Sequence, residues 1–531
     1  MATTIETDVV VIGAGITSAM FVERLAETTD ATITVLEAGD RIFNLNERYA
    51  ERDRFLTYGE NPWPGDHIEG QSADGILSRS MSVGGLAMHW GGVTPRFTPE
   101  DFRVRSLYGV GYDWPFTYDD LDPWYQEAEE RMGVAGEQGP AEYDRRMQDY
   151  PLPPLPHSYN IGRLKEWAEK SGIPFWRTPV AKLSEPYRGR NVCQRCDTCN
   201  ICPTGAKYSP DFSFLQLLEA GRIELHSRRL ARKLVLRSDS DQVEYVEVLD
   251  RDKPDEPVHY RAKTFVVAAG YCWSPHLLLL SANSRFPDGL ANRSGHVGRY
   301  MTGHRGIVTN VEVPEKLYPG MYFNDSLLSK RFQAKESEQY IRHDMRIWES
   351  DFERRAKLKD ADGKLMLGDA VLDEWRARAG KGVAQLRAYY DVIPDRDSSL
   401  TLSATDRNPW GDPLPVIRFR DSEWTRDLLD DTKATIEARF DAIVAAGGGR
   451  TIATREYATH DHPCGGCRMG EDPAASVVDP FGRTHDHENL WVVGTPTMVS
   501  SGCNNGTLTF SALALRSAAA MAEDMPTGQA N

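Results

Sequence analysis

The chain contains 531 residues, of which 40% are hydrophobic and 10% aromatic, enough to bury a core in about two to four domains. Its 44 glycines and 31 prolines are too few for a collagen-like or low-complexity chain. With 78 acidic against 62 basic side chains, a net charge of −16, it offers no general basic surface, and we expect no nucleic-acid partner.

Two features of the chain bear on its location. No run reaches the roughly 18 apolar residues that span a bilayer, so direct membrane insertion is not expected. The first eight residues lack the positive and apolar regions of a signal peptide. We therefore expect a cytoplasmic protein, and export together with a partner that carries a signal stays open.

The N-terminus predicts a strand, a glycine-rich turn, a helix and a second strand. An apolar, β-branched run fills residues 8–13, which is typical of a buried parallel strand. A helical pattern follows over 18–28, and a second strand pattern covers 31–36. This order is that of a βαβ nucleotide-binding unit in an α/β protein.

The residues of the turn predict dinucleotide binding. Gly13 and Gly15 would let the backbone approach a pyrophosphate at a helix N-terminus, and Ser18 is small enough to stand in for the usual third glycine. Glu37, at the end of the second strand, would accept a ribose hydroxyl. The pattern alone does not distinguish FAD from NAD.

A second glycine-rich segment covers residues 82–97. It contains Gly84 and Gly85 before His89 and Trp90, and two more glycines after them. Glycines let a backbone come close to a flat or bulky group, so this loop is a second expected cofactor contact.

Four cysteines lie within ten residues in the pattern C-x2-C-x2-C-x2-C-P, at Cys193, Cys196, Cys199 and Cys202. Thiolates at this density suit an iron–sulfur cluster or zinc. The ferredoxin run has one more residue before its last cysteine, and zinc sites usually separate two CxxC pairs by a longer loop. An iron–sulfur cluster, zinc and no metal all stay open at this point.

The remaining elements follow in chain order. Alternating patterns over 223–250 and 258–269 predict strands, the second running into a turn at Gly270. The charged, aromatic stretch 306–400 predicts the core of a separate substrate domain. We expect a helix over 421–447, a buried strand over 489–494 that ends at Gly494, and a closing helix over 511–523. A further CxxC pair, Cys464 and Cys467, is interpreted as two packed thiols.

The two ends of the chain resemble the glucose–methanol–choline (GMC) oxidoreductases. The segment His462 to Gly470 reads HPCGGCRMG, and similar runs follow at 477–483, 489–494 and 505–509. Asn505 follows His462 by 43 residues, as the second catalytic residue of that family follows its histidine. Gly506 departs from the family by replacing a proline. The resemblance extends from about residue 7 to about residue 523.

The resemblance implies an α/β fold, with a discontinuous Rossmann-like FAD-binding domain and an α+β substrate-binding domain that contains an antiparallel sheet. The ranges we assign to the FAD-binding domain are 1–110, 190–300, including the cysteine segment, and 455–531. The substrate-binding or cap domain would comprise 111–189 and 301–454.

Two branches of the family match different segments. The cysteine segment resembles that of membrane-linked sugar dehydrogenases, some of which carry an iron–sulfur cluster, [3Fe-4S] or [4Fe-4S], beside FAD. It implies a small subunit or another electron acceptor as partner, although this chain is one residue shorter and has the extra Cys196. The loop around His89 resembles the site where pyranose oxidases attach FAD to a histidine, which leaves covalent attachment open.

The resemblance implies that the protein oxidises a secondary alcohol of a sugar or glycoside. His462 would be the base, Asn505 would donate a hydrogen bond to the alkoxide, and Gly494 and Thr507 would lie beside the cofactor. His460 competes with His462, because residues two apart in an extended chain share a face. An oxygen-using oxidase that makes peroxide, a flavin-binding subunit without turnover and an NAD enzyme stay open.

Overall fold

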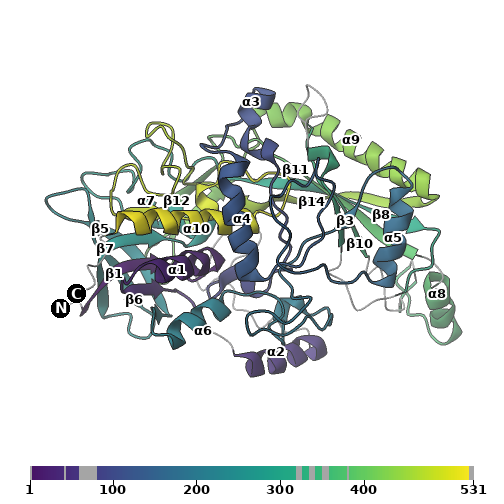
Figure 1. Cartoon of the computed structure of the whole chain (residues 1–531), viewed down its shortest axis with the longest axis horizontal. Coiled ribbons are helices and arrows are strands. Elements are labelled where there is room, and N and C mark those ends of the chain that lie inside the picture. Colours follow the sequence, from purple (N-terminus) through teal and green to yellow (C-terminus); the bar gives the residue numbers. More distant parts are fainter. Residues whose placement is uncertain are drawn as a thin grey trace.

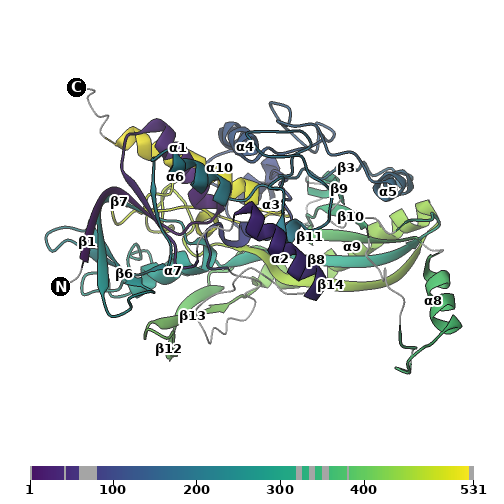
Figure 2. The same cartoon turned by 90° about the horizontal axis from the view of Figure 1, so that it is seen from below.

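The computed structural model describes residues 3–40, 44–58, 80–318, 326–333, 341–349, 358–360, 362–379 and 382–525; the side chains of 377–379 and 457–461 are outside the description. Two sheets at opposite ends of the molecule organise these residues, with helix α4 (Tyr118–Met132) between them (Figure 1). In Figure 2 the two sheets are again apart, and strands β12 and β13 form a separate ribbon.

The first sheet has seven strands in the order β4-β2-β1-β7-β6-β5, with β15 also paired to β7. Strands β4, β2, β1, β7 and β15 are parallel neighbours, whereas β5 and β6 add antiparallel pairs. The run Val9 to Ile12 is buried in this sheet because helices cover it. The strands are β1 (Thr3–Ile12), β2 (Ile33–Leu36), β4 (Glu224–His226), β5 (Arg229–Leu236), β6 (Val243–Asp250), β7 (Pro257–Val267) and β15 (Leu490–Val492).

Four helices are associated with this sheet and its neighbourhood. Helix α1 (Ile16–Thr28) packs on α10 (Thr507–Asp524), and α10 packs on α4 (Tyr118–Met132). Helix α6 (Asp211–Glu219) packs on α1. Helix α10 begins four residues before the expected start at residue 511, because Gly506 already serves as its N-cap. This places its first turn, with Thr507, beside the cavity described below.

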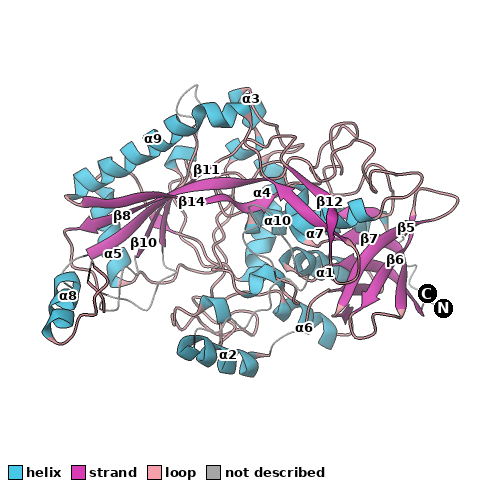
Figure 3. Ribbon diagram, turned by 180° about the vertical axis from the view of Figure 1, so that it is seen from behind, coloured by secondary structure: helices cyan, strands magenta, loops and turns pink. Residues whose placement is uncertain are grey.

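The second sheet has six antiparallel strands in the order β14-β8-β11-β10-β9-β3. Alternate residues of β10 and β11, such as Ile347 and Leu386, are buried in a core with α5 (Tyr159–Glu169) and α9 (Glu423–Gly447). Figure 3 shows α9 lying along this sheet. The strands are β3 (Trp176–Arg177), β8 (Thr302–Val313), β9 (Ser326–Ser329), β10 (Met345–Glu349), β11 (Gly382–Tyr390) and β14 (Arg450–Cys464).

The other elements are helix α7 (Gly270–Leu280), which follows β7 and packs against β5 of the first sheet, and several short or peripheral segments. These segments are the helices α2 (Leu45–Tyr58), α3 (Val104–Tyr108) and α8 (Asp369–Ala379), the ribbon β12 (Ser399–Arg407) and β13 (Pro413–Arg418), and the 3₁₀ turns η1 (Gly85–Met88), η2 (Pro99–Phe102), η3 (Cys199–Ile201), η4 (Arg331–Gln333) and η5 (Thr495–Thr497).

The expected α/β fold with a second, antiparallel sheet is confirmed. The first sheet draws its strands from 3–36, 224–267 and 490–492, and the second draws them from 176–177 and 302–464. The predicted boundary at residue 455 falls within β14, so the division of the chain into the two sets of ranges stays a prediction.

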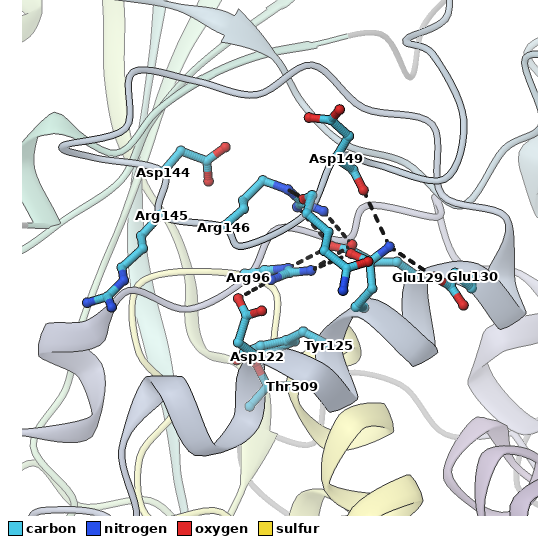
Figure 4. A network of polar contacts seen from close by, with 12 residues as sticks. Arg96, Asp122, Tyr125, Glu129, Glu130, Asp144, Arg145, Arg146, Asp149 and Thr509 are labelled. Carbon is cyan, nitrogen blue, oxygen red and sulfur yellow. Dashed lines mark hydrogen bonds and ion pairs between the residues drawn. The ribbon is translucent and has the colours of Figure 1, made fainter.

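A buried network of charges holds the segment after the His89 loop against α4 (Figure 4). The guanidinium of Arg96, 1% exposed, donates to Glu129 at 2.8 and 2.9 Å and to Asp122 at 2.6 Å. Arg146 donates to the same Glu129 at 3.0 and 2.6 Å. Burial alone would raise the pKa of Glu129, but the two guanidinium charges lower it below its ordinary value. The carboxylate is therefore ionised and fully paired.

Candidate active site

A cavity of about 560 Å³ lies between the two sheets. Its lining comes from the ends of β1, β2 and β7, from the loop that contains η1, from β10 and β11, and from the end of β14 with the start of α10. A cavity of this size at the carboxyl ends of parallel strands is where an α/β protein binds a nucleotide or another small ligand.

The end of the cavity at the first sheet is built for a close backbone approach. Gly13 has φ +104°, and a Cβ atom there would lie 2.7 Å from the carbonyl oxygen of Ala268, so glycine is required. Gly15 caps α1, and its neighbours line the cavity. Helices α7 and α10 also begin at the lining, so three helix N-termini, each with a partial positive charge, face this cavity.

Glu37 lies beside this end of the cavity. Its carboxylate accepts hydrogen bonds from the backbone amides of Ala14 at 2.9 Å and Gly39 at 2.8 Å. Burial raises the pKa of Glu37 to about 7, against the opposite effect of these amides. The side chain therefore fixes the glycine turn after β1 to the end of β2, in the position expected for a ribose contact.

The loop that contains η1 forms one wall. The amide of Gly84 donates to the carbonyl of Ala14 at 2.7 Å, and the indole of Trp90 donates to the carbonyl of Tyr208 at 2.9 Å. His89 lines the cavity, and its Nδ1 is buried without a hydrogen-bond partner. Burial lowers the pKa of His89, and the charge of nearby Lys207 lowers it further. A neutral imidazole with an unused nitrogen thus faces the cavity.

At the second sheet, His462 and Asn505 meet. Asn505 Nδ2 lies 2.7 Å from His462 Nε2, and His462 Nδ1 lies 2.8 Å from Nε2 of His304. With the amide assigned as donor, His462 Nε2 carries a lone pair and Nδ1 carries the proton. His462 also has φ +48°, a conformation that residues other than glycine rarely adopt and that concentrates at functional sites.

The cavity fits FAD by three observations on the structure. Gly15, at the lining, has no atom within 4 Å of the position that a Cβ would take, so the turn leaves open space there, and the helix N-termini supply positive ends for a pyrophosphate. Two polar atoms at the lining, His89 Nδ1 and Asn505 Oδ1, are buried without partners in the described structure. Such atoms are costly unless a ligand satisfies them.

The four cysteines of the motif line a second, smaller cavity of about 50 Å³. All four are partly buried and none forms a disulfide. Burial raises the pKa of Cys193. Burial would also raise that of Cys202, but the Lys207 amide, 3.4 Å from Sγ, and the Lys207 charge lower it. Cys202 is therefore the more thiolate-like of these two.

The spacing of the sulfur atoms distinguishes two kinds of metal site. Among the described residues, which include 193–202 in full, no three of these cysteines have sulfurs within 4.8 Å of one another. Sulfurs around a tetrahedral zinc would be about 3.8 Å apart, given Zn–S bonds of 2.3 Å. The geometry is therefore wider than a preformed zinc site.

The second CxxC pair is structural. Cys464 and Cys467 are buried and not disulfide-bonded, and burial raises the pKa of both thiols well above the ordinary value. A buried thiol of this kind is unreactive.

The predicted cofactor residues fall into two groups. Gly13, Gly15, Glu37, Gly85, His89, Trp90, Gly270 and Thr507 line the large cavity. Ser18, Gly84 and Gly494 lie outside its lining: Ser18 is fully buried in α1, and a Cβ atom on Gly494 would meet Thr17. The side chain of His460 lies outside the described residues, so its competition with His462 stays open.

Several residues of the cavity were not found from the sequence. Arg346, Trp348, Arg387 and Tyr389 line it, and His304 contacts His462. The available signal was the alternation of polar and apolar residues in β10 and β11, which places every second side chain on one face. Without the strand pairing, the sequence does not show what that face contacts.

Comparisons with known proteins agree with this architecture. A family model described as GMC oxidoreductase matches residues 394–514. The fructose dehydrogenase large subunit of Gluconobacter japonicus is 32% identical, covering 99% of each chain. The 6'''-hydroxyparomomycin C oxidase of Streptomyces lividus is 29% identical, covering 98% of this chain and 92% of the other. Among solved structures, pyridoxine 4-oxidase from Mesorbium loti has the same fold, with a TM-score of 0.60 and 18% identity over 97% of this chain and 98% of the other.

Proposed function

The chain belongs to the GMC oxidoreductase family and is thus an FAD-dependent enzyme acting on CH–OH groups; from this premise we propose that it oxidises a secondary alcohol of a sugar or glycoside. The observation that carries the proposal is the contact of His462 with Asn505 and His304 at the cavity. The names of the two relatives, one acting on fructose and one on hydroxyparomomycin, support a sugar-like substrate.

In the proposed reaction, His462 Nε2 accepts the proton of the substrate hydroxyl. His304 holds the imidazole through Nδ1, which keeps the lone pair of Nε2 turned towards Asn505. Asn505 Nδ2 donates a hydrogen bond to the same oxygen and stabilises the charge that develops there. A bound FAD would supply the acceptor for the hydride of the carbinol carbon. Gly13, Gly15, Glu37, Gly85, His89, Trp90, Gly270 and Thr507 would hold it, with Ser18, Gly84 and Gly494 packed behind them.

We further propose a route by which electrons leave the flavin. Cys193, Cys196, Cys199 and Cys202 line one cavity, and their sulfurs are spaced more widely than a zinc site needs. Three or four of these thiolates would hold a [3Fe-4S] or [4Fe-4S] cluster, which would supply one-electron transfer towards a small subunit or another external acceptor. An oxidase that reduces dioxygen is the second candidate, favoured by the printed activity of the relative from Streptomyces lividus.

One observation bears on the location of the protein. No helix among the described residues is long and apolar enough to cross a membrane. A cytoplasmic location stays the expectation.

The decisive experiment is spectroscopy of protein purified without oxygen. A flavin spectrum, bleached by a sugar or other alcohol, is expected, with about three or four irons and matching sulfide per chain. Cys199→Ser should lose the iron, whereas Cys467→Ser, at a buried cysteine outside the motif and outside the lining of the large cavity, should keep it. Flavin without iron, together with peroxide formed in air, would favour the oxidase. Acid denaturation then shows whether the flavin is attached to the chain at His89.

The variant His462→Ala tests the role of His462 as the base independently of flavin binding. It should keep its flavin but lose about 10²- to 10⁴-fold in the rate of bleaching. No bleaching of the unchanged protein by any alcohol or sugar would refute the proposed function.

A further inference from the structure

Two arginines stand directly opposite each other in the second sheet. Arg346 on β10 pairs with Arg387 on β11 in the antiparallel register, and both line the large cavity. Like charges at directly opposite positions destabilise a sheet. Asp344 offsets the charge of Arg346, so the fold tolerates the pair, and both arginines remain available at the wall of the cavity.

Both guanidinium groups are held in place by neighbouring side chains. Arg346 Nε donates to Asp344 at 2.5 Å and its Cζ lies 5.0 Å from the centre of the Tyr389 ring. Arg387 donates to the neutral amide oxygen of Gln385 at 2.5 and 3.1 Å, and its Cζ lies 4.8 Å from the Trp348 ring. Fixed planar groups of this kind are pre-organised for a bidentate acceptor.

Two donors on this wall have no acceptor. Arg346, 1% exposed, has Nη2 buried without a hydrogen-bond partner, and the same is true of Nε1 of Trp348, which is 9% exposed. Buried donors are normally satisfied, so both indicate a ligand atom that accepts hydrogen bonds.

The carboxylates that line the large cavity do not compete for the two arginines. The described lining includes two of them, Glu37 and Asp412. Glu37 accepts from backbone amides at the opposite end of the cavity, and Asp412 is paired with Arg232 at 2.5 Å. The carboxylates of the described lining therefore lie away from β10 and β11, where Asp344, 2.5 Å from Nε, offsets the charge of Arg346 from behind the wall.

The arginines lie within reach of the proposed base. The Tyr389 ring is 5.7 Å from the ring of His462 and 5.0 Å from Arg346 Cζ, so one sugar-sized molecule can contact both. The phosphates of FAD belong at the glycine turn of the other sheet. The ligand of the arginine pair is therefore the substrate.

We infer that Arg346 and Arg387 form an oxyanion subsite, and that the substrate is a sugar derivative with a carboxylate or phosphate group held there while its secondary alcohol contacts His462 and Asn505. This inference rests on the proposed function for the position of the alcohol. A substrate that offers only ammonium groups here would leave the donors of this wall without an acceptor.

The test compares three probes on the holoenzyme under anaerobic conditions: D-glucose, D-gluconate and D-glucose 6-phosphate. Binding is measured by calorimetry and by the change in the flavin spectrum. At least one anionic probe should bind about tenfold or more tightly than glucose, and its affinity should fall with added salt. The carboxylate and phosphate probes distinguish the two sources of the oxyanion.

Arg387→Gln tests the assignment, because this side chain is only partly buried and its loss leaves the Arg346–Asp344 pair intact. The anionic probe should lose about 10- to 100-fold in affinity and glucose less than threefold, with Arg387→Lys in between. For a substrate that is turned over, KM should rise with kcat nearly unchanged. The control is Arg450→Gln, on an exposed arginine of β14 outside the cavity, which should behave as the unchanged enzyme.

Equal affinity for glucose and both anions would overturn the inference, as would an Arg387→Gln enzyme that keeps the preference for the anion. Neither result would affect the proposed function if sugars still bleach the flavin. Conversely, tight anion binding without bleaching by any alcohol would refute the proposed function and leave the subsite standing. Should Arg387→Gln not fold, the shift in melting temperature of the unchanged holoenzyme with anionic against neutral probes gives the same decision.

Discussion

Lys207 lies between the cysteine cavity and the loop with His89, which forms one wall of the large cavity. Replacing Lys207 should make that loop less ordered. Its Nζ donates to the carbonyls of Met88 at 2.8 Å and Trp90 at 3.1 Å, on either side of His89. The side chain is 2% exposed, and no described carboxylate forms an ion pair with it. Lys207→Met would leave both carbonyls without this donor while removing a buried charge.

The size of the effect follows from those two bonds. Each buried carbonyl left without its donor costs about 1–3 kcal/mol, so the free energy that holds the His89 loop in place should fall by about 2–6 kcal/mol. The overall stability should change less, because burial lowers the pKa of Lys207 to about 7, and this shift costs the folded state several kcal/mol at neutral pH that the variant avoids. We therefore expect FAD to bind at least about 30-fold more weakly, since 1.4 kcal/mol is tenfold, with a small change in melting temperature.

The assay is the Kd of FAD on reconstituted apoprotein, with the flavin retained per chain after dialysis as a second measurement. Lys165→Met is the control, because Lys165 is a surface residue of α5 that pairs with Glu169 at 3.8 Å. A Lys207→Met protein that binds FAD within threefold of the unchanged protein would refute the reasoning. So would a loss of melting temperature large enough to explain the weaker binding by unfolding.

Three further predictions concern other parts of the structure. Arg96→Met should destabilise the protein by about 3–5 kcal/mol in urea unfolding, because it leaves the buried Asp122 without its guanidinium partner and Glu129 with Arg146 alone. Arg145→Met, at an exposed pair with Asp119, should cost less than about 1 kcal/mol, and equal effects of the two variants would contradict this reasoning. Burial raises the pKa of Glu37 from 4.5 to about 7, so between these pH values the folded apoprotein holds a proton that the unfolded chain has released. The free energy of unfolding should therefore fall by about 3 kcal/mol as the pH rises from about 4.5 to about 7. Glu37→Gln should remove this pH dependence, and an unchanged pH dependence would show that Glu37 is not its source. Asn505→Ala should keep its flavin and lose about 10²- to 10³-fold in kcat, measured with any sugar that bleaches the enzyme, and a loss in KM alone would speak against a role in the transition state.

Local patterns predicted the first sheet well and the second sheet poorly. The strand over 8–13 and the helix after it are coded by neighbouring residues, so both appear within a few positions of the prediction, as β1 and α1. The partners of the second sheet are distant: β8 pairs with β14, more than 130 residues later, and with β11. Nothing in a single strand specifies such a partner.

The same distinction applies to the site. Residues in motifs, such as Gly13, His89 and His462, could be named because their spacing has a chemical reason. Arg346 and Arg387 could not be named, because each is an ordinary arginine until the register places them opposite each other. Lys207 lies five residues after Cys202 in the sequence, but its contact with the carbonyls around His89 requires the three-dimensional structure.

The alternation within β10 and β11 explains how one fold can serve different substrates. Ile347 and Leu386 point into the core with α5 and α9, whereas Arg346 and Arg387 point to the cavity. A substitution on the cavity face therefore changes what the wall binds without opening a void in the core, where the loss of buried volume would be costly. His462 and Asn505 lie on other segments, at the end of β14 and the start of α10. The groups proposed to do the chemistry and the groups proposed to select the substrate can thus change independently, so the arginine pair is better evidence about the substrate of this enzyme than its membership of the family.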